Sequence, residues 1–466
     1  MKTRSQEWWK RQLVQRSTAT LNDDMERLFS ESPFLSAHPS RDVAKFDRSE
    51  IVTGRVLGKG GFSVVYEVIG FDLDSFVSRS LRPEERKLRE AYARNVLDPK
   101  TKRSRFVIKY LRPETVRHGF REAANDLVLE GEFLSRLQHE NIIALHGLPV
   151  NGVNAWQDGL HDGYFLILDR LTETLDHCLH NKIAKAPSER KKMEYALDLA
   201  SAIEYLHSHG IVFRDLKPSN LGFSSTGRIQ LYDFGLAREL PGDGNDLYEM
   251  SGVGTRRYMA PEVIRERLYN AKVDVYSWSM VVWQLFTHCK PYSLYSPVEH
   301  ARHVCIGGER PPLGKGLDIH GDLKASLCLS PFLKDLLAHC WDESIRDRCS
   351  MSDVRRRMQC EMARMNGSFF YTEATPEGIE VTISFDLGST RQFDRDEDNN
   401  TVSLTEKFGE SFDETQSSLS LGHLVMKESV SDTEGCYPVL KSVLSGSTCS
   451  TSSLSAADSF LGTYII

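Results

Sequence analysis

A glycine-rich turn between two apolar stretches is the first part of this chain whose residue types suggest chemistry. Glycines carry no Cβ atom, so their backbone N–H groups can close over a bound polyanion. Most turns of this kind are plain hairpins, so the turn alone is a weak sign of phosphate binding. It comprises Leu57, Gly58, Lys59, Gly60, Gly61, Phe62, Ser63, Val64 and Val65.

A single lysine ends the next apolar stretch, Phe106-Val107-Ile108-Lys109. A lone strand lysine is usually an exposed charge, but a carboxylate that holds its ammonium would give it a function. Glu130, on the helix expected to follow, is our candidate for that carboxylate. Glu132 is the competitor, interpreted as a solvated helix acid.

Three further stretches carry acids, amides and basic residues in a fixed order. They read Val212-Phe213-Arg214-Asp215-Leu216-Lys217-Pro218-Ser219-Asn220, Leu231-Tyr232-Asp233-Phe234-Gly235 and Gly254-Thr255-Arg256-Arg257-Tyr258-Met259-Ala260-Pro261-Glu262. With the glycine-rich turn, Lys109 and Glu130, this set resembles the signature of the eukaryotic protein kinases. The resemblance covers residues 51–362, about two thirds of the chain.

The resemblance implies phosphoryl transfer from ATP with Mg²⁺ as the metal cofactor. Lys109 would hold the α- and β-phosphates, and Glu130 would orient its ammonium. Asp233 and Asn220 would ligate Mg²⁺, which prefers oxygen donors. Asp215 would accept the proton of the substrate hydroxyl.

The resemblance also implies which residues surround adenine. Leu57 and Val65 would enclose the ring, and Leu168 would be the gatekeeper. The backbones of Asp169 and Leu171 would bond the adenine edge.

The class of acceptor follows from the catalytic loop. Lys217-Pro218-Ser219-Asn220 is similar to the loop of Ser/Thr kinases, in which the lysine stabilises the transferring phosphate; tyrosine kinases usually have Ala and Arg there. Thr255 fits the Ser/Thr-type pocket, where its hydroxyl would reach Asp215 and Lys217. Gly307–Pro312, Cys340-Trp341 and Arg348 resemble the tyrosine-kinase-like group of Ser/Thr kinases, and Arg348 is expected to pair with Glu262.

Regulation is also implied by position. Arg214 precedes the expected catalytic aspartate, and kinases with this arginine commonly pair it with an activation-loop phosphate. Ser251 stands eleven residues before Glu262, the spacing of the family's main activating site. We favour Ser251 over Tyr248, with an unmodified loop serine as the alternative.

The chain departs from the family pattern at three positions. Ser63 replaces the third glycine of the loop, Phe213 replaces the usual histidine, and Gly222 stands where a leucine normally supports adenine. None of these changes removes a charge that the reaction needs. Catalytic competence is therefore expected. A pseudokinase scaffold that binds nucleotide without efficient catalysis is the alternative function, and a small-molecule kinase is a weaker one.

The elements that must position these residues follow from hydrophobic periodicity. We expect strands at 51–56, 64–69, 106–111 and 164–168, and helices at 120–137, 189–207 and 273–286. A strand-rich half followed by a helix-rich half indicates two lobes. With the resemblance, this implies an α+β fold class: a bilobal kinase-like fold with a small antiparallel β-rich N-lobe, one main helix there, and a larger α-helical C-lobe.

Composition divides the chain into three parts. We predict a polar, partly helical leader (1–50) without sustained periodicity, a kinase domain (51–362; N-lobe 51–168, C-lobe 172–362) and a tail (363–466). The tail is Ser-rich, acidic and mostly disordered, apart from a strand-like stretch at 378–385. A basic insertion at about 70–105 carries a helix-like centre at 84–93; it would dock an acidic partner or the tail, or extend as a solvated helix.

Overall composition excludes several classes of protein. The formal charge of −7 argues against nucleic-acid binding. Nine Cys without a C-x-x-C pair favour free thiols over a disulfide framework or zinc ribbon. No apolar run reaches the length of a membrane span. We expect a cytoplasmic protein, with access to the nucleus left open and a targeting role for the basic N-terminus as the alternative.

Overall fold

The computed structural model describes the backbone of residues 2–73, 77, 79, 81–117, 119–181, 187–240, 242, 246–314 and 329–366, and of six short strands beyond them. The chain divides into two units, residues 1–355 and 356–466. Among the helices described, none has the length and apolar character needed to cross a bilayer.

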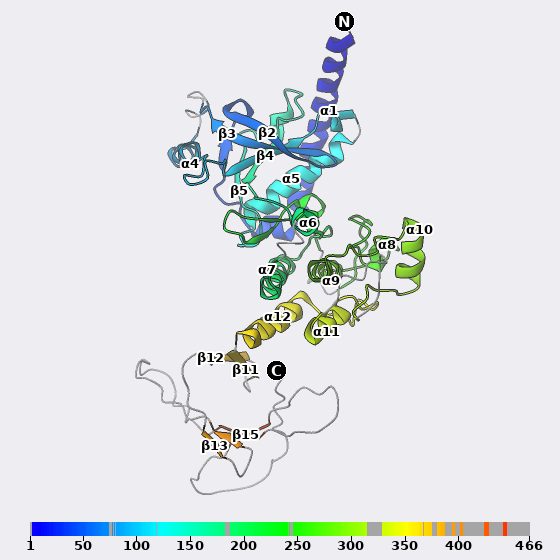
Figure 1. The fold of residues 1–466 in the computed structure, drawn as a ribbon. Coiled ribbons are helices and arrows are strands. Elements are labelled where there is room, and N and C mark those ends of the chain that lie inside the picture. The colour runs from blue at the N-terminus through cyan, green and yellow to red at the C-terminus, as the bar shows by residue number, and fades with distance from the viewer. Residues whose placement is uncertain are drawn as a thin grey trace, which may run out of the picture. The chain divides into compact units, whose positions relative to one another are not determined.

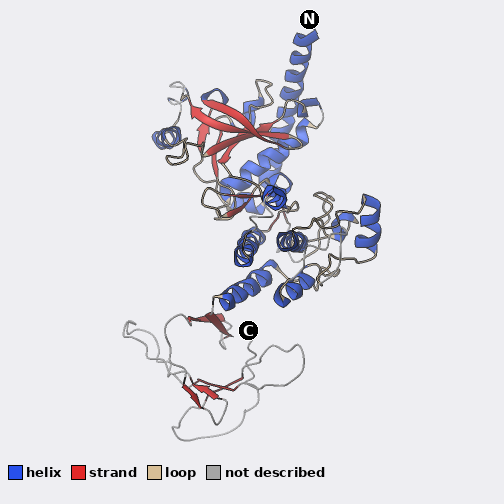
Figure 2. Ribbon diagram, viewed as in Figure 1, coloured by secondary structure: helices blue, strands red, loops and turns tan. Residues whose placement is uncertain are grey.

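A six-stranded sheet forms the first half of the larger unit (Figure 2). Its strands are β1 (Ala44–Phe46), β2 (Ile51–Lys59), β3 (Ser63–Phe71), β4 (Phe106–Leu111), β5 (Leu145–Pro149) and β6 (Phe165–Asp169), in the order β1-β5-β6-β4-β3-β2. The β1–β5 pair is parallel, and the other neighbours are antiparallel. Aromatic and β-branched residues dominate β4, which is buried along its whole length.

The described helices of this half are α1 (Lys2–Glu31), α2 (Pro33–Ala37), α4 (Pro83–Arg94) and α5 (Phe120–Arg136). Figure 1 shows α5 beside the sheet and α1 extending past it. The main helix predicted at 120–137 is α5. Its buried side chains recur at helical spacing, among them Ala124, Leu127 and Leu134, and the helix packs against β4 and β5 of the sheet.

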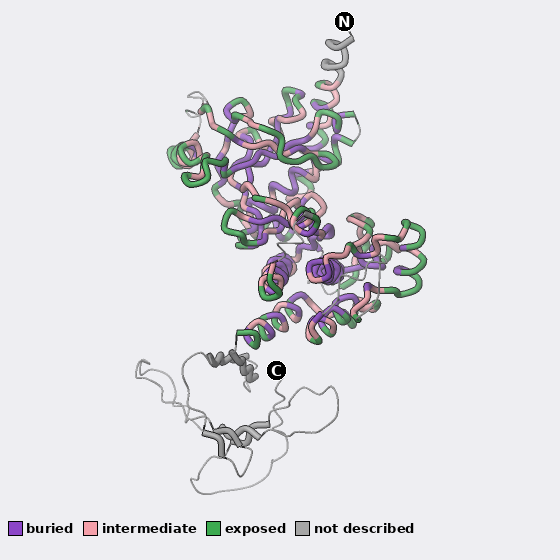
Figure 3. The backbone as a smooth tube through the Cα atoms, in the orientation of Figure 1, coloured by how far each residue is buried: buried purple, intermediate pink, exposed green. Residues whose placement is uncertain are grey.

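The second half of this unit is helical. It contains α6 (Leu175–Asn181), α7 (Glu189–Ser208), α8 (Pro261–Ile264), α9 (Lys272–Thr287), α10 (Pro297–His300), α11 (Pro331–Cys340) and the start of α12 (Met351–Met365). Helix α9 is buried almost all round, as its continuous apolar sequence predicts (Figure 3). The expected arrangement of a β-rich half followed by a helical half is confirmed.

Two short strand pairs carry the loops that the sequence analysis singled out. Strand β7 (Ile211–Val212) pairs with β10 (Arg238–Glu239), and β8 (Leu221–Phe223) pairs with β9 (Ile229–Leu231). The catalytic loop of the prediction lies between β7 and β8, and the Asp233-Phe234-Gly235 stretch lies between β9 and β10.

The basic insertion contains the predicted helix, α4, but it is not a solvated excursion. Arg89 is 1% exposed, forms an ion pair with the buried Glu50 and lies 5.4 Å from the Phe46 ring. Tyr92 hydrogen-bonds His146 at 3.2 Å. These contacts anchor α4 to the sheet, because a buried arginine needs a carboxylate partner. Docking of a partner by this insertion stays a prediction.

In the second unit, β11 (Ser368–Ala374) pairs antiparallel with β12 (Glu380–Asp386), which coincides with the stretch predicted to be strand-like. Four further strands form a small antiparallel sheet: β13 (Asp394–Asp396), β14 (Thr401–Ser403), β15 (Leu424–Lys427) and β16 (Lys441–Leu444). Most of the predicted disordered tail lies outside the described residues.

Candidate active site

The catalytic loop is fixed to the helical core by one buried carboxylate. Asp274, at the start of α9, accepts hydrogen bonds from the backbone N–H groups of Phe213 (2.8 Å) and Arg214 (2.9 Å). His207 of α7 contacts the same carboxylate at 3.0 Å. A fully buried acid requires such partners, and here they set the position of the residue that follows, Asp215.

Asp215 lies at the centre of a network of four side chains. Lys217 Nζ donates to Asp215 Oδ2 (2.6 Å) and to Thr255 Oγ1 (2.9 Å), and Thr255 Oγ1 donates to Asp215 Oδ1 at 2.9 Å. Asn220 Nδ2 donates to the backbone oxygen of Asp215 at 2.9 Å and to its Oδ2 at 3.0 Å. The structure therefore brings together Asp215, Lys217, Asn220 and Thr255, from two separate stretches of sequence.

A second network surrounds Lys109 on β4. Its ammonium lies 2.6 Å from Glu130 Oε2 on α5 and 2.7 Å from Asp233 Oδ1 after β9. Glu132 instead pairs with Arg136 at 2.6 Å, within α5. Of the two candidate acids, the structure places Glu130 at the lysine.

The electrostatics of this network follow from burial and charge. Burial alone would lower the pKa of Lys109, but the charges of Asp233 and Glu130 outweigh it and raise the pKa. Burial raises the pKa of Glu130 to about 7, although Lys109 opposes the shift. The charge of Lys109 lowers the pKa of Asp233. At neutral pH the site therefore holds a charged ammonium and at least one charged carboxylate.

The glycine-rich loop is the hairpin between β2 and β3. Gly58 and Lys59 pair with Val65 and Val64, and the Gly60 N–H donates to the Ser63 carbonyl at 2.9 Å. Residues that follow β4 hold the tip of this hairpin by hydrogen bonds. The Thr115 hydroxyl and the Arg112 N–H both donate to the Phe62 carbonyl (2.8 and 2.9 Å), and the Arg112 guanidinium donates to the Gly61 carbonyl.

Of the expected adenine residues, Leu57 lies on β2, Val65 on β3, and Leu168, Asp169 and Leu171 at or just after the end of β6. Leu168 is buried, the Asp169 N–H donates to the Ala144 carbonyl at 3.2 Å, and the Asp169 carboxylate lies 2.7 Å from His146 Nε2. A Cβ atom at Gly222 would lie 2.6 Å from Leu171 Cδ1. The space that a leucine would fill in the family is thus occupied by Leu171, and the adenine contacts of Asp169 and Leu171 stay predictions.

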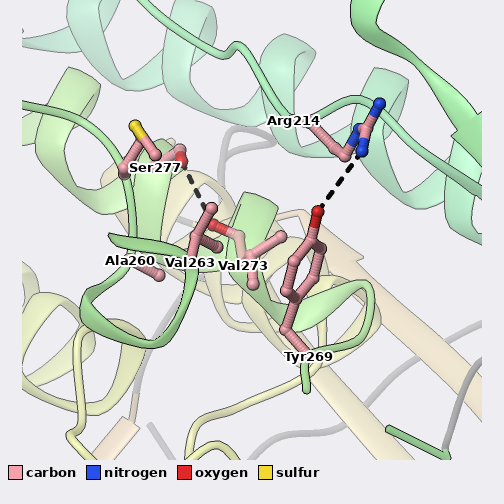
Figure 4. A pocket seen from close by; sticks show the side chains of 7 residues that line it. Arg214, Ala260, Val263, Tyr269, Val273 and Ser277 are labelled. Carbon is pink, nitrogen blue, oxygen red and sulfur yellow. Dashed lines mark hydrogen bonds between the residues drawn. The ribbon is translucent and has the colours of Figure 1, made fainter. Parts of the chain in front are cut away.

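Arg214 and Tyr269 line a small pocket together with Ala260, Val263 and Val273 (Figure 4). The Arg214 guanidinium donates to the Leu236 carbonyl at 2.7 Å and to Tyr269 Oη at 3.3 Å, and reaches Ser251 Oγ at 3.5 Å. Tyr269 Oη donates to the Ser251 carbonyl at 3.0 Å. The structure brings the predicted pair Arg214 and Ser251 within contact.

The sequence analysis missed an ion pair between α5 and the segment after Asp233-Phe234-Gly235. Arg238 on β10 donates to Asp126 at 2.8 Å. Asp126 stands one helical turn before Glu130, so the two acids lie on the same face of α5. That spacing was the only signal in the sequence, and a partner from β10 could not be read from it.

The oxygen donors present fit a hard cation such as Mg²⁺. The Asp233 side chain is 46% exposed although it touches Lys109, so its carboxylate is open to a further ligand. Asn220 uses its Nδ2 on Asp215, which leaves Oδ1 as its donor atom for a metal. A carboxylate and an amide carbonyl suit Mg²⁺ bound together with substrate phosphates.

Comparison with known proteins identifies the family. A model described as "protein kinase domain" matches residues 91–358, more than half of the chain. The chain therefore belongs to the protein kinase family, and the resemblance seen in the sequence is confirmed.

The curated relatives include several kinases of plants and animals. The chain is 31% identical over 274 residues to serine/threonine/tyrosine-protein kinase HT1 of Arabidopsis thaliana, covering 56% of this chain and 59% of that protein. It is 35% identical over 173 residues to serine/threonine-protein kinase VIK of A. thaliana (36% and 37%). It is 29% identical over 233 residues to mitogen-activated protein kinase kinase kinase 7 of Drosophila melanogaster (49% and 31%). The chain covers less than two thirds of the length of each.

Proposed function

We propose that the protein is a serine/threonine protein kinase that transfers the γ-phosphate of ATP to a Ser or Thr hydroxyl of a protein substrate. The carrying observation is the network in which Lys217 and Thr255 hold both carboxylate oxygens of Asp215. A carboxylate fixed in this way presents its remaining lone pairs in one direction, as a positioned proton acceptor must.

The reaction is an in-line displacement at phosphorus. A new bond forms between the acceptor oxygen and the γ-phosphorus, the bond from that phosphorus to the β,γ-bridging oxygen breaks, and ADP leaves. Asp215 takes the hydroxyl proton. Lys217, which already contacts Asp215, supplies positive charge beside the transferring phosphoryl group.

Lys109 binds the α- and β-phosphates of ATP, and Glu130 keeps its ammonium on the phosphate side. Asp233 and Asn220 are the residues that would hold Mg²⁺. The bound metal would supply charge neutralisation at the phosphate oxygens. The glycine-rich hairpin, held by Arg112 and Thr115, would cover those phosphates.

Two observations support Ser/Thr as the acceptor class. The Thr255 hydroxyl bridges Lys217 and Asp215, which is the contact expected of a Ser/Thr-type pocket. The relatives named above are described as serine/threonine or serine/threonine/tyrosine kinases or as a kinase kinase kinase.

We also propose that a phosphate on Ser251 activates the enzyme. The Ser251 hydroxyl already lies at Arg214, whose guanidinium also bonds the Leu236 carbonyl next to Asp233-Phe234-Gly235. A phosphate there would form charge-assisted hydrogen bonds to a buried arginine and order the segment between them.

The test is labelling with Mg-ATP of the wild type and of Asp215→Ala, with an exposed acid on α4, Glu90→Ala, as the matched control. The wild type and Glu90→Ala should label a Ser/Thr peptide library equally, and Asp215→Ala should lose about 10²- to 10⁴-fold in rate. Equal labelling by Asp215→Ala would contradict the proposed kinase activity and favour the alternative, a nucleotide-binding scaffold. Turnover of metabolites without peptide labelling would make the protein a small-molecule kinase.

Mass spectrometry of the same samples tests the activation proposal. Phosphate should be found on Ser251 in active wild-type protein, and Ser251→Ala should be less active. A fully active sample with unmodified Ser251 would contradict this part of the proposal.

A further inference from the structure

The segment before the sheet is packed onto the active-site helix rather than extending as a free leader. The buried face of α1 consists of Val14, Thr18, Leu21 and Met25, at intervals of four, three and four residues. That spacing marks one face of a helix. The face lies against α5 and the short turns η2 (Thr115–Arg117) and η3 (Gly152–Trp156).

Polar contacts tie this segment to both ends of α5. Asp24 of α1 forms a bidentate pair with Arg121 in the first turn of α5, at 2.7 to 2.9 Å. At the other end of α5, the Arg41 guanidinium donates to the Leu134 carbonyl at 2.8 Å, and the Arg41 backbone N–H donates to the Ser135 carbonyl at 2.9 Å. These carbonyls belong to the last turn of α5, where the helix itself offers no donors.

The same segment reaches the helical half of the molecule through α2 (Pro33–Ala37). Glu239 on β10 accepts hydrogen bonds from the Ser32 hydroxyl and from the Phe34 N–H (2.5 Å). The buried Phe34 ring lies between Phe133 of α5 (centroids 5.9 Å apart) and His209 at the end of α7 (5.8 Å). Residues 32–34 therefore touch both halves of the catalytic domain.

Together these contacts link three elements pairwise, β10, α2 and α5, and they meet α5 on both sides of Glu130. On β10, Arg238 forms an ion pair with Asp126 of α5, and the next residue, Glu239, accepts a hydrogen bond from Phe34 of α2. Helix α2 also packs against α5, because the Phe34 ring contacts the Phe133 ring. Since Asp126 and Phe133 stand about one turn to either side of Glu130, both neighbours of the turn that carries Glu130 are held.

We propose that residues 10–41 form an intramolecular clamp that positions α5, so that Glu130 stays within hydrogen-bond distance of Lys109. We call this segment the N-terminal clamp. Ser32, Phe34 and Glu239 are positioning residues, because none of them contacts Lys109 or Asp215. Glu239 pairs with Ile211 on β7, two residues before Phe213, so the clamp also meets the strand that leads into the catalytic loop.

The inference rests on the proposed phosphoryl transfer, and it predicts a specific kinetic pattern. Without the clamp, α5 moves and Lys109 loses Glu130, so the rate of phosphoryl transfer falls. The peptide-binding side is untouched. Glu239→Ala and Phe34→Ala should therefore each lower kcat about 3- to 30-fold while KM for the peptide stays constant.

The experiment uses the full chain with two matched controls. Glu239→Gln keeps a carbonyl oxygen for the Phe34 N–H and should recover most of the activity lost in Glu239→Ala. Arg27→Ala removes an exposed pair with Glu31 at the C-terminal end of α1, and should leave kcat unchanged. Backbone hydrogen exchange is measured on each variant, comparing amides of α5 with those of α9.

In Glu239→Ala and Phe34→Ala, α5 amides should exchange about tenfold faster while α9 amides stay as in the wild type. Unchanged kcat and unchanged α5 exchange would overturn the clamp. Equal acceleration in α5 and α9 would also overturn it, since the contacts would then serve only global stability. The exchange measurement needs no catalysis, so a wild type that labels no better than Asp215→Ala removes the proposed function without deciding the clamp.

Discussion

Glu130 and Asp233 are two carboxylates around one ammonium, and their surroundings shift their pKa values in opposite directions. Burial dominates at Glu130, which is 1% exposed, and raises its pKa to about 7. The charge of Lys109 dominates at Asp233 and lowers its pKa. At the scale of single residues, therefore, Glu130 is the group whose charge changes near neutral pH.

We expect activity to fall as the pH drops from about 8 to 6, because Glu130 then takes up a proton and no longer holds Lys109 as an ion pair. Glu130→Gln should be about tenfold or more less active at pH 8 and should change little over this range. Steady-state rates of both proteins across the range check the expectation. Parallel profiles would show that another group sets the pH dependence.

The same shift has a consequence for stability with a definite sign. A carboxyl whose pKa rises from 4.5 to about 7 on folding binds its proton more tightly in the folded state. The free energy of unfolding of the wild type should therefore decline, relative to Glu130→Gln, as the pH rises from 4.5 to about 7. Urea unfolding at several pH values measures the difference, and an increase over that range would refute the sign.

Thr255 offers a second test at this scale, because its hydroxyl is the only part of it that bridges Lys217 and Asp215. We expect Thr255→Ala to lower kcat about tenfold and Thr255→Ser to recover most of that loss. Equal rates for the Ala and Ser variants would mean that the hydroxyl contributes nothing.

At the scale of elements, α1 belongs to the folded catalytic unit. Leu21 is fully buried in its apolar face. Leu21→Ala should reduce the free energy of unfolding by about 2 to 5 kcal/mol, since it leaves a cavity. Thr20→Ala, on the exposed side of the same helix, should change it by less than about 0.5 kcal/mol. Denaturant melts of both variants measure this, and equal stabilities would show that α1 is not packed in solution.

The sequence interpretation of this segment as a polar, partly helical leader without sustained periodicity missed the buried face of α1. The stripe Val14, Thr18, Leu21, Met25 is present in the sequence, but it includes a threonine and is surrounded by charged residues. What buries this face is its packing against α5, and the Asp24–Arg121 pair that joins the two helices spans 97 positions of the sequence. The local sequence pattern is compatible with a helix, but only the contacts with α5 show which face of that helix is buried.

At the scale of the whole catalytic unit, Arg348 joins α8, α9 and the loop after α11 in the helical half. It pairs with Glu262 of α8 at 2.7 Å and donates to the carbonyls of Lys272 (3.1 Å) and Asp342 (2.9 Å). The arginine is fully buried, so its removal leaves Glu262 without its partner.

We therefore expect Arg348→Ala to lower the free energy of unfolding by about 3 to 5 kcal/mol. Arg265→Ala, which breaks a more exposed pair with Glu343, should cost less than about 1 kcal/mol. Thermal scans that rank the two variants the other way would contradict this assignment of the buried pair.

The sequence by itself determined the order of the elements, the family and the identity of the charged residues. Strand and helix periodicity is local, and the motifs around Lys109, Asp215 and Asp233 lie in short continuous stretches. The tertiary structure placed the predicted Glu130 at Lys109, and it alone decided where Leu171 packs and that α1 and α2 bind α5. Those contacts depend on three-dimensional distances between distant segments, which no local pattern records.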